Sequence, residues 1–343
     1  MSIRGKRLRT VWLLAALVGP TALIAQKRYV APGVVGEITQ PVVTELWREP
    51  QDIRSENLFY GAGGKEHEPH GPFTFVKEDL DGTNPKYDVR DENGVKWKIK
   101  LGPEAQPETA ASRFVWAVGY HVDEDYFAAE IQVNGLPAHV HRGQHLIGAG
   151  GVMRNARLKR EDDKKEGIWR WRENPFADTR ELDGLRVMMA IINNWDLKDA
   201  NNAIRNEKRK DDGDKRVYEV SDLGASFGTT GRGLSTAKSK GNLNAYTRSK
   251  FITKERPEFV NFATPSHPTL LLVFDPHEFF SRMGMRGLGR NVPRQNARWI
   301  GDMLGQLSPD QIRDAFRSAG YEGAELDGFA ADFARRVEEL KKL

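Results

Sequence analysis

The stretch N-N-W-D-L-K-D-A-N-N at residues 193–202 decides how the rest of the chain is interpreted. Asp196 is followed five residues later by Asn201, and Asp222 begins the tripeptide D-L-G at residues 222–224. An in-line attack on a terminal phosphate needs a carboxylate that faces the incoming hydroxyl and oxygen ligands that hold Mg²⁺ against the phosphates. Asp196 is therefore the candidate for positioning the hydroxyl, with Lys198 as a second catalytic candidate. Asn201 and Asp222 are the candidate ligands of Mg²⁺.

A helix and a strand are expected on the two sides of this motif. Residues 178–181 have the composition of a capped helix start, and apolar residues then recur at helical spacing up to the motif: Leu182, Leu185, Met188, Met189 and Ile192. After the motif, Ala203-Ile204 begins one expected strand, and the charged run 205–216 has the composition of a solvated loop. Residues 217–221 alternate as a strand that ends at Asp222.

Three further strands and a helix are expected upstream of the motif. The strands are residues 73–76, 86–90 and 95–101, and Asn93-Gly94 is a signal for a tight hairpin between the last two. Lys96, Lys98 and Lys100 share one face of the third strand, because side chains alternate along a strand. We expect Lys100, with Lys98 as the alternative, to contact nucleotide phosphates. We expect its partner to be Glu108, near the start of a helix over residues 107–118.

This order of a strand Lys, a helix Glu, the motif Asp and Asn, and a second Asp resembles the protein-kinase-like superfamily. The resemblance covers residues 73–224 and is to the atypical branches: the HipA-type toxin kinases, the phosphoinositide kinases and the secretory-pathway kinases. It implies an α+β, two-lobed, protein-kinase-like fold, with a small antiparallel β lobe at residues 72–135 and a larger, mainly helical lobe at residues 136–343. It also implies ATP and Mg²⁺ as cofactors, and transfer of the terminal phosphoryl group to an acceptor that bears a hydroxyl group.

The sequence also departs from the standard kinase pattern. Asn194-Trp195 stands where protein kinases carry His-Arg, and no Ala-Pro-Glu follows Asp222. The glycine-rich residues 61–64 come before the first strand, so the expected nucleotide loop is residues 79–85. These departures exclude a standard Ser/Thr or Tyr kinase. They leave an atypical kinase or, as the alternative, a noncatalytic kinase-like binding or scaffold protein of the cell envelope.

The first 25 residues have the pattern of a secretory leader. Four basic residues, Arg4, Lys6, Arg7 and Arg9, precede an apolar run at residues 11–25. The run is shorter than the roughly 20 residues of a membrane span. We expect cleavage after Ala25 and an exported protein of the periplasm or cell envelope, with anchoring by residues 11–25 as the alternative. Residues 26–71 are expected to form an irregular N-terminal extension.

The charge balance argues against nucleic acid as a partner. The chain has 52 Lys and Arg against 48 Asp and Glu, and the four basic residues of the leader account for the whole net charge of +4. Nucleic-acid binding would need a clustered basic face. We therefore expect a nucleotide and a hydroxyl-bearing acceptor as partners, no nucleic acid, and membrane contact only through an uncleaved N-terminal segment. The chain has no Cys and so forms no disulfide.

Two other chemistries remain as alternatives in the sequence. His139, His141 and His145 have the residue type and spacing of a zinc site, although no carboxylate lies between them to activate water. Residues 224–228 match the nucleophile pattern G-x-S-x-G, with the strand 217–221 before it. The residues that follow, 229–233, are poor helix formers, which argues against a nucleophile elbow.

Overall fold

The computed structural model describes residues 43–161, 165–209, 213–229, 239–263, 271–274, 276, 279–280, 285 and 287–343. The expected leader and residues 26–42 of the expected extension lie outside the described residues. Among the residues that are described, no helix has the length and apolar character needed to cross a membrane.

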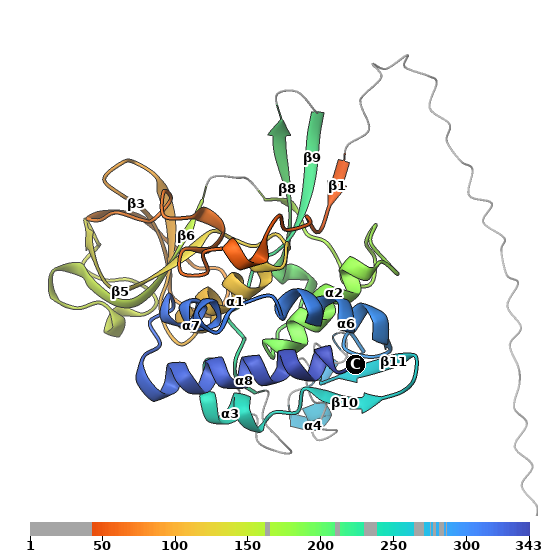
Figure 1. Ribbon diagram of the computed structural model, residues 1–343. Coiled ribbons are helices and arrows are strands. Elements are labelled where there is room, and N and C mark those ends of the chain that lie inside the picture. Colours follow the sequence, from red (N-terminus) through yellow and green to blue (C-terminus); the bar gives the residue numbers. More distant parts are fainter. Residues whose placement is uncertain are drawn as a thin grey trace, which may run out of the picture. The chain divides into compact units, whose positions relative to one another are not determined.

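Five strands close into a barrel, and this closure overturns the expected kinase-like two-lobed fold (Figure 1). The strands are β2 (Phe73–Asp79), β3 (Lys86–Arg90), β4 (Lys96–Lys100), β5 (Asp125–Asn134) and β6 (Val152–Arg160), in the order β2-β3-β4-β6-β5. Parallel pairing of Phe73 with Val133 and of Thr74 with Asn134 closes the barrel. The chain is α+β, but the expectation of a small antiparallel β lobe was wrong, because these strands belong to a closed barrel with one parallel pairing.

The physical reason for this error is the range of the closing contact. A tight turn such as Asn93-Gly94 announces its hairpin locally, because the turn residues favour the necessary backbone conformation. The pairing of β2 with β5 joins residues that are far apart in the sequence, and no local pattern encodes it. Alternation along β4 is as expected: Trp97 and Ile99 are buried in the barrel core, while Lys98 and Lys100 lie on the other face.

Two smaller sheets accompany the barrel. One has the order β1-β9-β8-β7, with β1 (Val43–Glu45), β7 (Lys165–Gly167), β8 (Asn202–Arg209) and β9 (Gly213–Val220). The other contains β10 (Ile252–Glu255), β11 (Phe259–Phe262) and β12 (Val292–Pro293). The charged run expected to be a loop therefore contributes most of the β8–β9 hairpin. Its charges indicate contact with solvent and ion pairing, both of which a strand permits.

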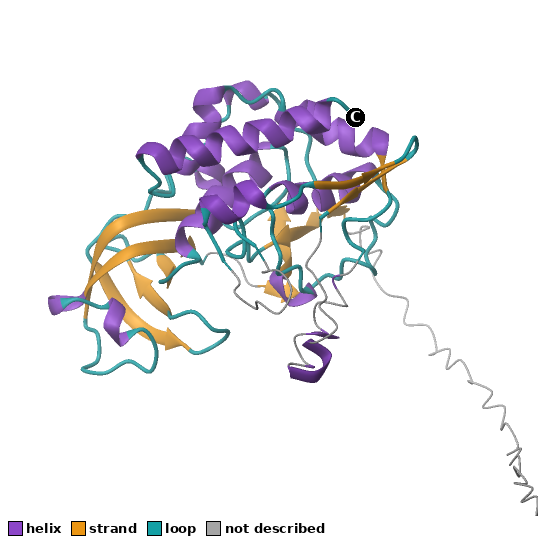
Figure 2. Cartoon of the chain, turned by 90° about the horizontal axis from the view of Figure 1, so that it is seen from below, coloured by secondary structure: helices purple, strands orange, loops and turns teal. Residues whose placement is uncertain are grey.

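The helices enclose the larger core (Figure 2). They are α1 (Ala105–Ala117), α2 (Arg180–Ile191), α3 (Leu243–Arg248), α4 (Leu271–Phe274), α6 (Arg294–Leu304), α7 (Pro309–Arg317) and α8 (Gly323–Lys341). Single 3₁₀ turns lie at Ile53–Ser55, Gly61–Gly63, Gln144–Leu146, Ala149–Gly151 and Asp199–Asn201. The expected helix before the motif is confirmed as α2, and the Thr179 side chain caps it by accepting from the Leu182 backbone N–H.

Helix α1 joins the barrel to the helices. It follows β4 after a short turn and packs against β5 and β6 on one side and against α7 on another. Phe114 of α1 stacks on Phe333 of α8 with ring centroids 3.8 Å apart, inside the larger core. Because α1 is buried along most of its length, its acidic first turn is fixed in place beside the end of β4.

Candidate functional site

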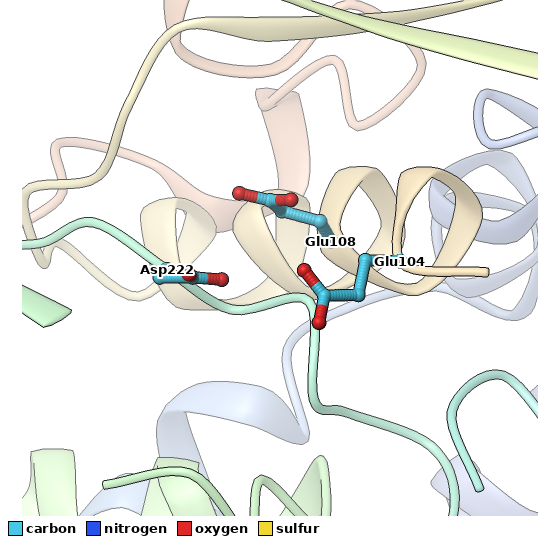
Figure 3. Close-up of side chains that lie close together, drawn as sticks. All are labelled: Glu104, Glu108 and Asp222. Carbon is cyan, nitrogen blue, oxygen red and sulfur yellow. The ribbon is translucent and has the colours of Figure 1, made fainter. Parts of the chain in front are cut away.

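Lys100, at the end of β4, brings together three carboxylates from two parts of the chain. Its Nζ lies 3.1 Å from Glu104 Oε2, 2.7 Å from Glu108 Oε2 and 3.2 Å from Asp222 Oδ1. Glu104 and Glu108 stand at the start of α1, and Asp222 follows β9 (Figure 3). The expected contact between Lys100 and Glu108 is therefore present, and Asp222 lies beside it.

Burial and charge act together on this cluster. Burial raises the pKa of Glu108 to about 7, although Arg157 and Lys100 oppose the rise. Arg157 Nη2 contacts Glu108 Oε1 at 2.8 Å, so each oxygen of this carboxyl faces a cation. Burial alone would lower the pKa of Lys100, but Glu108 and Asp222 outweigh it and the pKa rises. Lys100 is thus a charged ammonium group at neutral pH, buried but within reach of the surface through Asp222.

The three carboxylates also form a group with the geometry to surround a cation. Their oxygens lie within 4.8 Å of one another, and no other such group of ligating side chains occurs in the described part of the chain. Lys100 contacts all three, so the ammonium already supplies the positive charge of this group. We therefore assign the group to Lys100 and do not treat it as a separate metal site.

Asp222 is the member of this group that faces outward. Its side chain is 44% exposed, against 2% for Glu108. Burial tends to raise its pKa, but Lys100 and Arg157 lower it and the net direction is downward. Lys100 and the Gly224 backbone N–H both contact Oδ1 of Asp222, which leaves Oδ2 as the oxygen available to a further cation.

The other motif residues lie next to Asp222 because the backbone ties them there. The carbonyl of Asn201 accepts from the N–H groups of Ser221 and Asp222, at 2.9 and 3.3 Å. The Asn201 side chain donates its Nδ2 to the Asp196 carbonyl at 2.7 Å. Because the amide nitrogen of Asn201 is used in this way, its oxygen can serve as a ligand. Lys198 Nζ lies 3.0 Å from Asp196 Oδ1. Asp196, Lys198, Asn201 and Asp222 are therefore neighbours in space.

The side chain of Asn194 fixes the backbone of the motif at Asp196. Its buried side chain accepts from the Asp196 backbone N–H at 2.9 Å. The backbone N–H of Trp195 donates to the Ala225 carbonyl at 3.3 Å, so the motif runs beside the segment that follows Asp222. Asn193 takes up the left-handed conformation, with φ of 52°, and donates its side-chain amide to the Gly228 carbonyl. The side chains of Asn193 and Asn194 therefore hold the motif in place.

Lys98 is not part of the carboxylate group. Its Nζ contacts Asp79 Oδ2 at 2.7 Å and Asp88 Oδ1 at 3.4 Å, both within the barrel hairpin of β2 and β3. Of the two alternatives, only Lys100 therefore lies against Asp222. The sequence pattern placed both on one face, and their neighbours distinguish them: Lys100 stands at the strand end, where α1 begins.

The expected nucleotide loop, residues 79–85, is held by the connection between β5 and β6. The guanidinium of Arg142 donates to the carbonyls of Asp79 and Gly82. Glu78, at the end of β2, accepts from the backbone N–H groups of His141 and Arg142, each at 2.8 Å. These contacts order a loop that has none of the glycine-rich character of a standard phosphate loop. Arg142 was not singled out in the sequence, because its role depends on contacts about sixty residues away.

Three further residues near the site, Lys86, Glu104 and Lys240, were missed in the sequence. Lys86 pairs in register with Lys100 across β3 and β4, so both side chains stand on one face of the barrel. Glu104 bridges two cations, Lys100 and Lys240. The four-residue spacing from Lys100 to Glu104 was a readable signal for this pair, whereas Lys240 lies far along the chain. Gly224 packs so closely on Glu104 that an added Cβ would lie 2.7 Å from the Glu104 Cβ.

The two alternative chemistries find no support in the described residues. His139, His141 and His145 are all exposed, and among the described side chains they enter no group of three potential metal ligands. His141 Nδ1 instead contacts Glu78 Oε2 at 3.0 Å. Ser226 of the G-x-S-x-G pattern is fully buried, with 0% exposure, so it is not presented as a nucleophile. The residues expected to lack helix after it lie largely outside the described residues.

No family model, curated protein or solved structure matches this chain. The function therefore has to be argued from the site itself.

Proposed function

We propose that this chain binds a nucleoside triphosphate with Mg²⁺ and transfers the terminal phosphoryl group to a hydroxyl acceptor. The observation that carries the proposal is the contact of Lys100 with both Glu108 and Asp222, at 2.7 and 3.2 Å, from positions separated by more than 100 residues. A buried ammonium fixed between carboxylates, with one carboxylate partly exposed, is an arrangement that suits the binding of phosphate together with a metal ion. Asp196 and Asn201 lie beside the exposed carboxylate.

Each residue has a role that follows from its surroundings. Glu108, itself paired with Arg157, orients Lys100, and Lys100 then presents its charge to the phosphates. Asp196 accepts the proton of the attacking hydroxyl or positions that hydroxyl. Lys198, in contact with Asp196 and 47% exposed, stabilises negative charge on the transferred group.

The residues fit Mg²⁺ by donor type. Mg²⁺ prefers oxygen ligands and keeps several waters, so one or two protein ligands are sufficient. Asp222 supplies a carboxylate oxygen and Asn201 an amide oxygen, and hydrogen bonds of their backbones keep the two residues adjacent. When bound, the ion would neutralise charge between the phosphate groups.

We also propose that the chain is exported, because its basic residues 4–9 and apolar residues 11–25 match a secretory leader. ATP is scarce outside the cytoplasm, which makes the noncatalytic alternative a meaningful outcome of any test. N-terminal sequencing of the protein recovered from a periplasmic fraction would show whether the chain begins after Ala25.

Binding and transfer need separate experiments. Mg²⁺·ATP should raise the melting temperature of the wild type, and at 100 times the Kd it should add about 2.7 kcal/mol to the free energy of unfolding. Asp222→Asn should remove most of this effect. Asp196→Ala should keep the thermal shift but lose ATP turnover and transfer of the γ-phosphate.

These experiments distinguish an active phosphotransferase from a noncatalytic nucleotide-binding protein. A thermal shift without turnover in the wild type favours a noncatalytic nucleotide-binding protein. A wild type whose melting temperature is unchanged by ATP and Mg²⁺ contradicts the proposed function altogether. Asp302→Asn, a change on the exposed surface of α6, serves as the control for loss of a carboxylate.

A further inference from the structure

Lys86 stands beside Lys100 on the face of the barrel that carries the candidate site. It begins β3 and pairs in register with Lys100 across the two antiparallel strands. The Leu101 backbone N–H donates to the Pro85 carbonyl at 3.0 Å, which fixes this pairing at its end. Neighbouring strands lie about 4.8 Å apart. The two ammonium groups are therefore placed to contact neighbouring groups of one ligand.

The ammonium of Lys86 also lies against the expected nucleotide loop, residues 79–85. A Cβ added at Gly82 would lie 3.7 Å from Lys86 Nζ, so the ammonium is close to the backbone of the loop. Asp79, where the loop begins, has its Oδ2 3.8 Å from the same Nζ. Lys86 thus stands between this loop and Lys100, on the path that phosphate groups held by Lys100 would follow toward the loop.

The protein leaves the ammonium of Lys86 without a hydrogen bond. The separation of 3.8 Å from Asp79 Oδ2 is too long for one. Lys98 already donates to that oxygen at 2.7 Å, and the Asp81 backbone N–H donates to Asp79 Oδ1 at 2.9 Å. Among the described residues, Lys86 has no second ion-pair partner, although its side chain is only 19% exposed. All three of its N–H donors therefore remain available to a ligand.

Electrostatics distinguishes Lys86 from the other two lysines of this face. Burial lowers its pKa; Asp79 and Asp222 oppose this, but Lys100 and Lys98 add to the lowering, and the net direction is downward. The pKa of Lys98 and that of Lys100 move upward, because their carboxylate neighbours outweigh burial. Of the three, Lys86 is therefore the cation whose charge the protein compensates least. An anionic group of a ligand would supply the missing compensation.

We infer that Lys86 is a second phosphate-binding residue of the site, and that the phosphate chain lies across β3 and β4, with one phosphate group against Lys100 and a neighbouring one against Lys86. The nucleoside part of the ligand rests on the proposed function, whereas the contact with a polyphosphate follows from the positions of the two ammonium groups. A ligand with a single phosphate group cannot use both cations in this way.

The test is calorimetric titration of the full chain and of Lys86→Met with Mg²⁺·ATP. The variant should bind at least about tenfold more weakly, a loss of about 1.4 kcal/mol. Lys98→Met is the matched control, because Lys98 is equally shielded, at 22% exposure, and faces the same carboxylate. Its affinity should stay within about twofold of the wild type. Without ligand, Lys86→Met should melt no lower than the wild type, because it removes a poorly compensated charge.

Asp79→Asn separates contact with phosphate from an effect that passes through Asp79. A Lys86 that served only to neutralise Asp79 would become unimportant once that carboxylate is gone. We expect the double variant D79N/K86M to bind Mg²⁺·ATP at least about tenfold more weakly than Asp79→Asn alone. A loss that disappears in this background overturns the inference, and so does a Lys86→Met variant that binds within about twofold of the wild type.

Tripolyphosphate with Mg²⁺, which carries no nucleoside, separates this inference from the proposed function. Binding of Mg²⁺·ATP by the wild type with unchanged affinity in Lys86→Met overturns the inference and leaves the proposed function standing. No binding of Mg²⁺·ATP by the wild type contradicts the proposed function. In that case, tripolyphosphate bound at least about tenfold more weakly by Lys86→Met than by the wild type supports the phosphate contact. Equal binding of tripolyphosphate by the two proteins, or no binding, overturns the inference as well.

Discussion

At the scale of single residues, the position of a lysine along β4 decides which carboxylates it contacts. Lys98 and Lys100 share a face of β4, yet Lys98 pairs with Asp79 and Asp88 while Lys100 pairs with Glu108 and Asp222. Alternation reveals the shared face but contains no information about what stands opposite it. The sequence therefore narrowed the choice to two lysines, and the end of the strand, where α1 turns back, distinguishes them.

This difference gives a matched pair of variants. Lys100→Met should reduce the affinity for Mg²⁺·ATP at least about tenfold, because the phosphates lose their buried cation. Lys98→Met removes the same charge from the same face and should leave the affinity within about twofold. Titration calorimetry on both variants measures the effect. Equal losses in the two variants would show that the site responds to general charge and that Lys100 has no special place.

At the scale of elements, Asp79 at the end of β2 forms a pH-sensitive ion pair with Lys98 of β4 and Lys86 of β3. Burial would raise the pKa of Asp79, but Lys98 and Lys86 lower it to about 2. A lowered carboxyl pKa stabilises the fold above the ordinary value of 3.8, and this contribution is lost as the pH falls through about 2. At pH 6 the free energy of unfolding should be higher in the wild type than in Asp79→Asn by up to about 2 kcal/mol.

Urea unfolding between pH 6 and pH 2.5 tests this expectation. The difference between wild type and variant should shrink as the pH falls below 4, because the Asp79 carboxyl of the unfolded chain then takes up a proton while that of the folded chain stays ionised down to about pH 2. A difference that stays constant over this range would mean that the Asp79 ion pair contributes nothing to stability.

The close contact between Gly224 and the start of α1 is a second element-scale feature. A Cβ at Gly224 would lie 2.7 Å from the Glu104 Cβ, so Gly224→Ala must displace α1 or the segment after Asp222. We expect a loss of about 1–3 kcal/mol in stability and weaker binding of Mg²⁺·ATP, since Lys100 loses its geometry. Gly148→Ala is the control, because an added Cβ there meets its nearest atom at an ordinary 3.4 Å. Chemical denaturation with and without nucleotide measures both effects, and equal behaviour of the two variants would contradict the account.

Some elements could be predicted from the sequence, and others could not. The capped start of α2 and its apolar spacing identify the helix because both signals are local. Strands were expected at residues 203–204 and 217–221, but the charged residues 205–209 and 213–216 concealed the full length of β8 and β9, because their composition indicates exposure to solvent and not backbone conformation. Asp196, Asn201 and Asp222 could be chosen as candidates because their spacing forms a motif in the sequence. Arg142 and Lys240 belong to no such motif and could not be chosen. Their contacts depend on how distant segments meet.

At the scale of the whole molecule, the closed barrel is the feature that the sequence did not reveal. Its closing strands, β2 and β5, pair in parallel over two residues only, and this pairing makes a barrel of the strands that were expected to form a small antiparallel lobe. The barrel and the helices then meet at α1, so the site lies where the two parts of the fold join. Stability of the helical part should therefore affect the motif at residues 193–202.

Arg336 offers a test of that connection. It is fully buried in α8 and donates to the Ile191 carbonyl at 3.2 Å and to the Tyr246 carbonyl at 2.8 Å. Arg336→Leu should cost about 3 kcal/mol of stability, because it removes the buried hydrogen bonds that a charged guanidinium makes to the ends of α2 and α3. Arg335→Leu removes the neighbouring, half-exposed arginine and should cost less than about 1 kcal/mol. Thermal unfolding of the two variants measures the difference, and similar costs would show that Arg336 does not secure α8 to α2.

Calorimetric titration of the wild type and Asp222→Asn with ATP, in the presence and absence of Mg²⁺, tests the central claim most directly. The account predicts one saturable site in the wild type, tighter with Mg²⁺ than without it, and at least about tenfold weaker in Asp222→Asn. Asp222 is the outward-facing member of the Lys100 group, so its removal should affect metal and phosphate binding together. No saturable binding in the wild type, or equal binding of Mg²⁺·ATP by both proteins, would contradict the account.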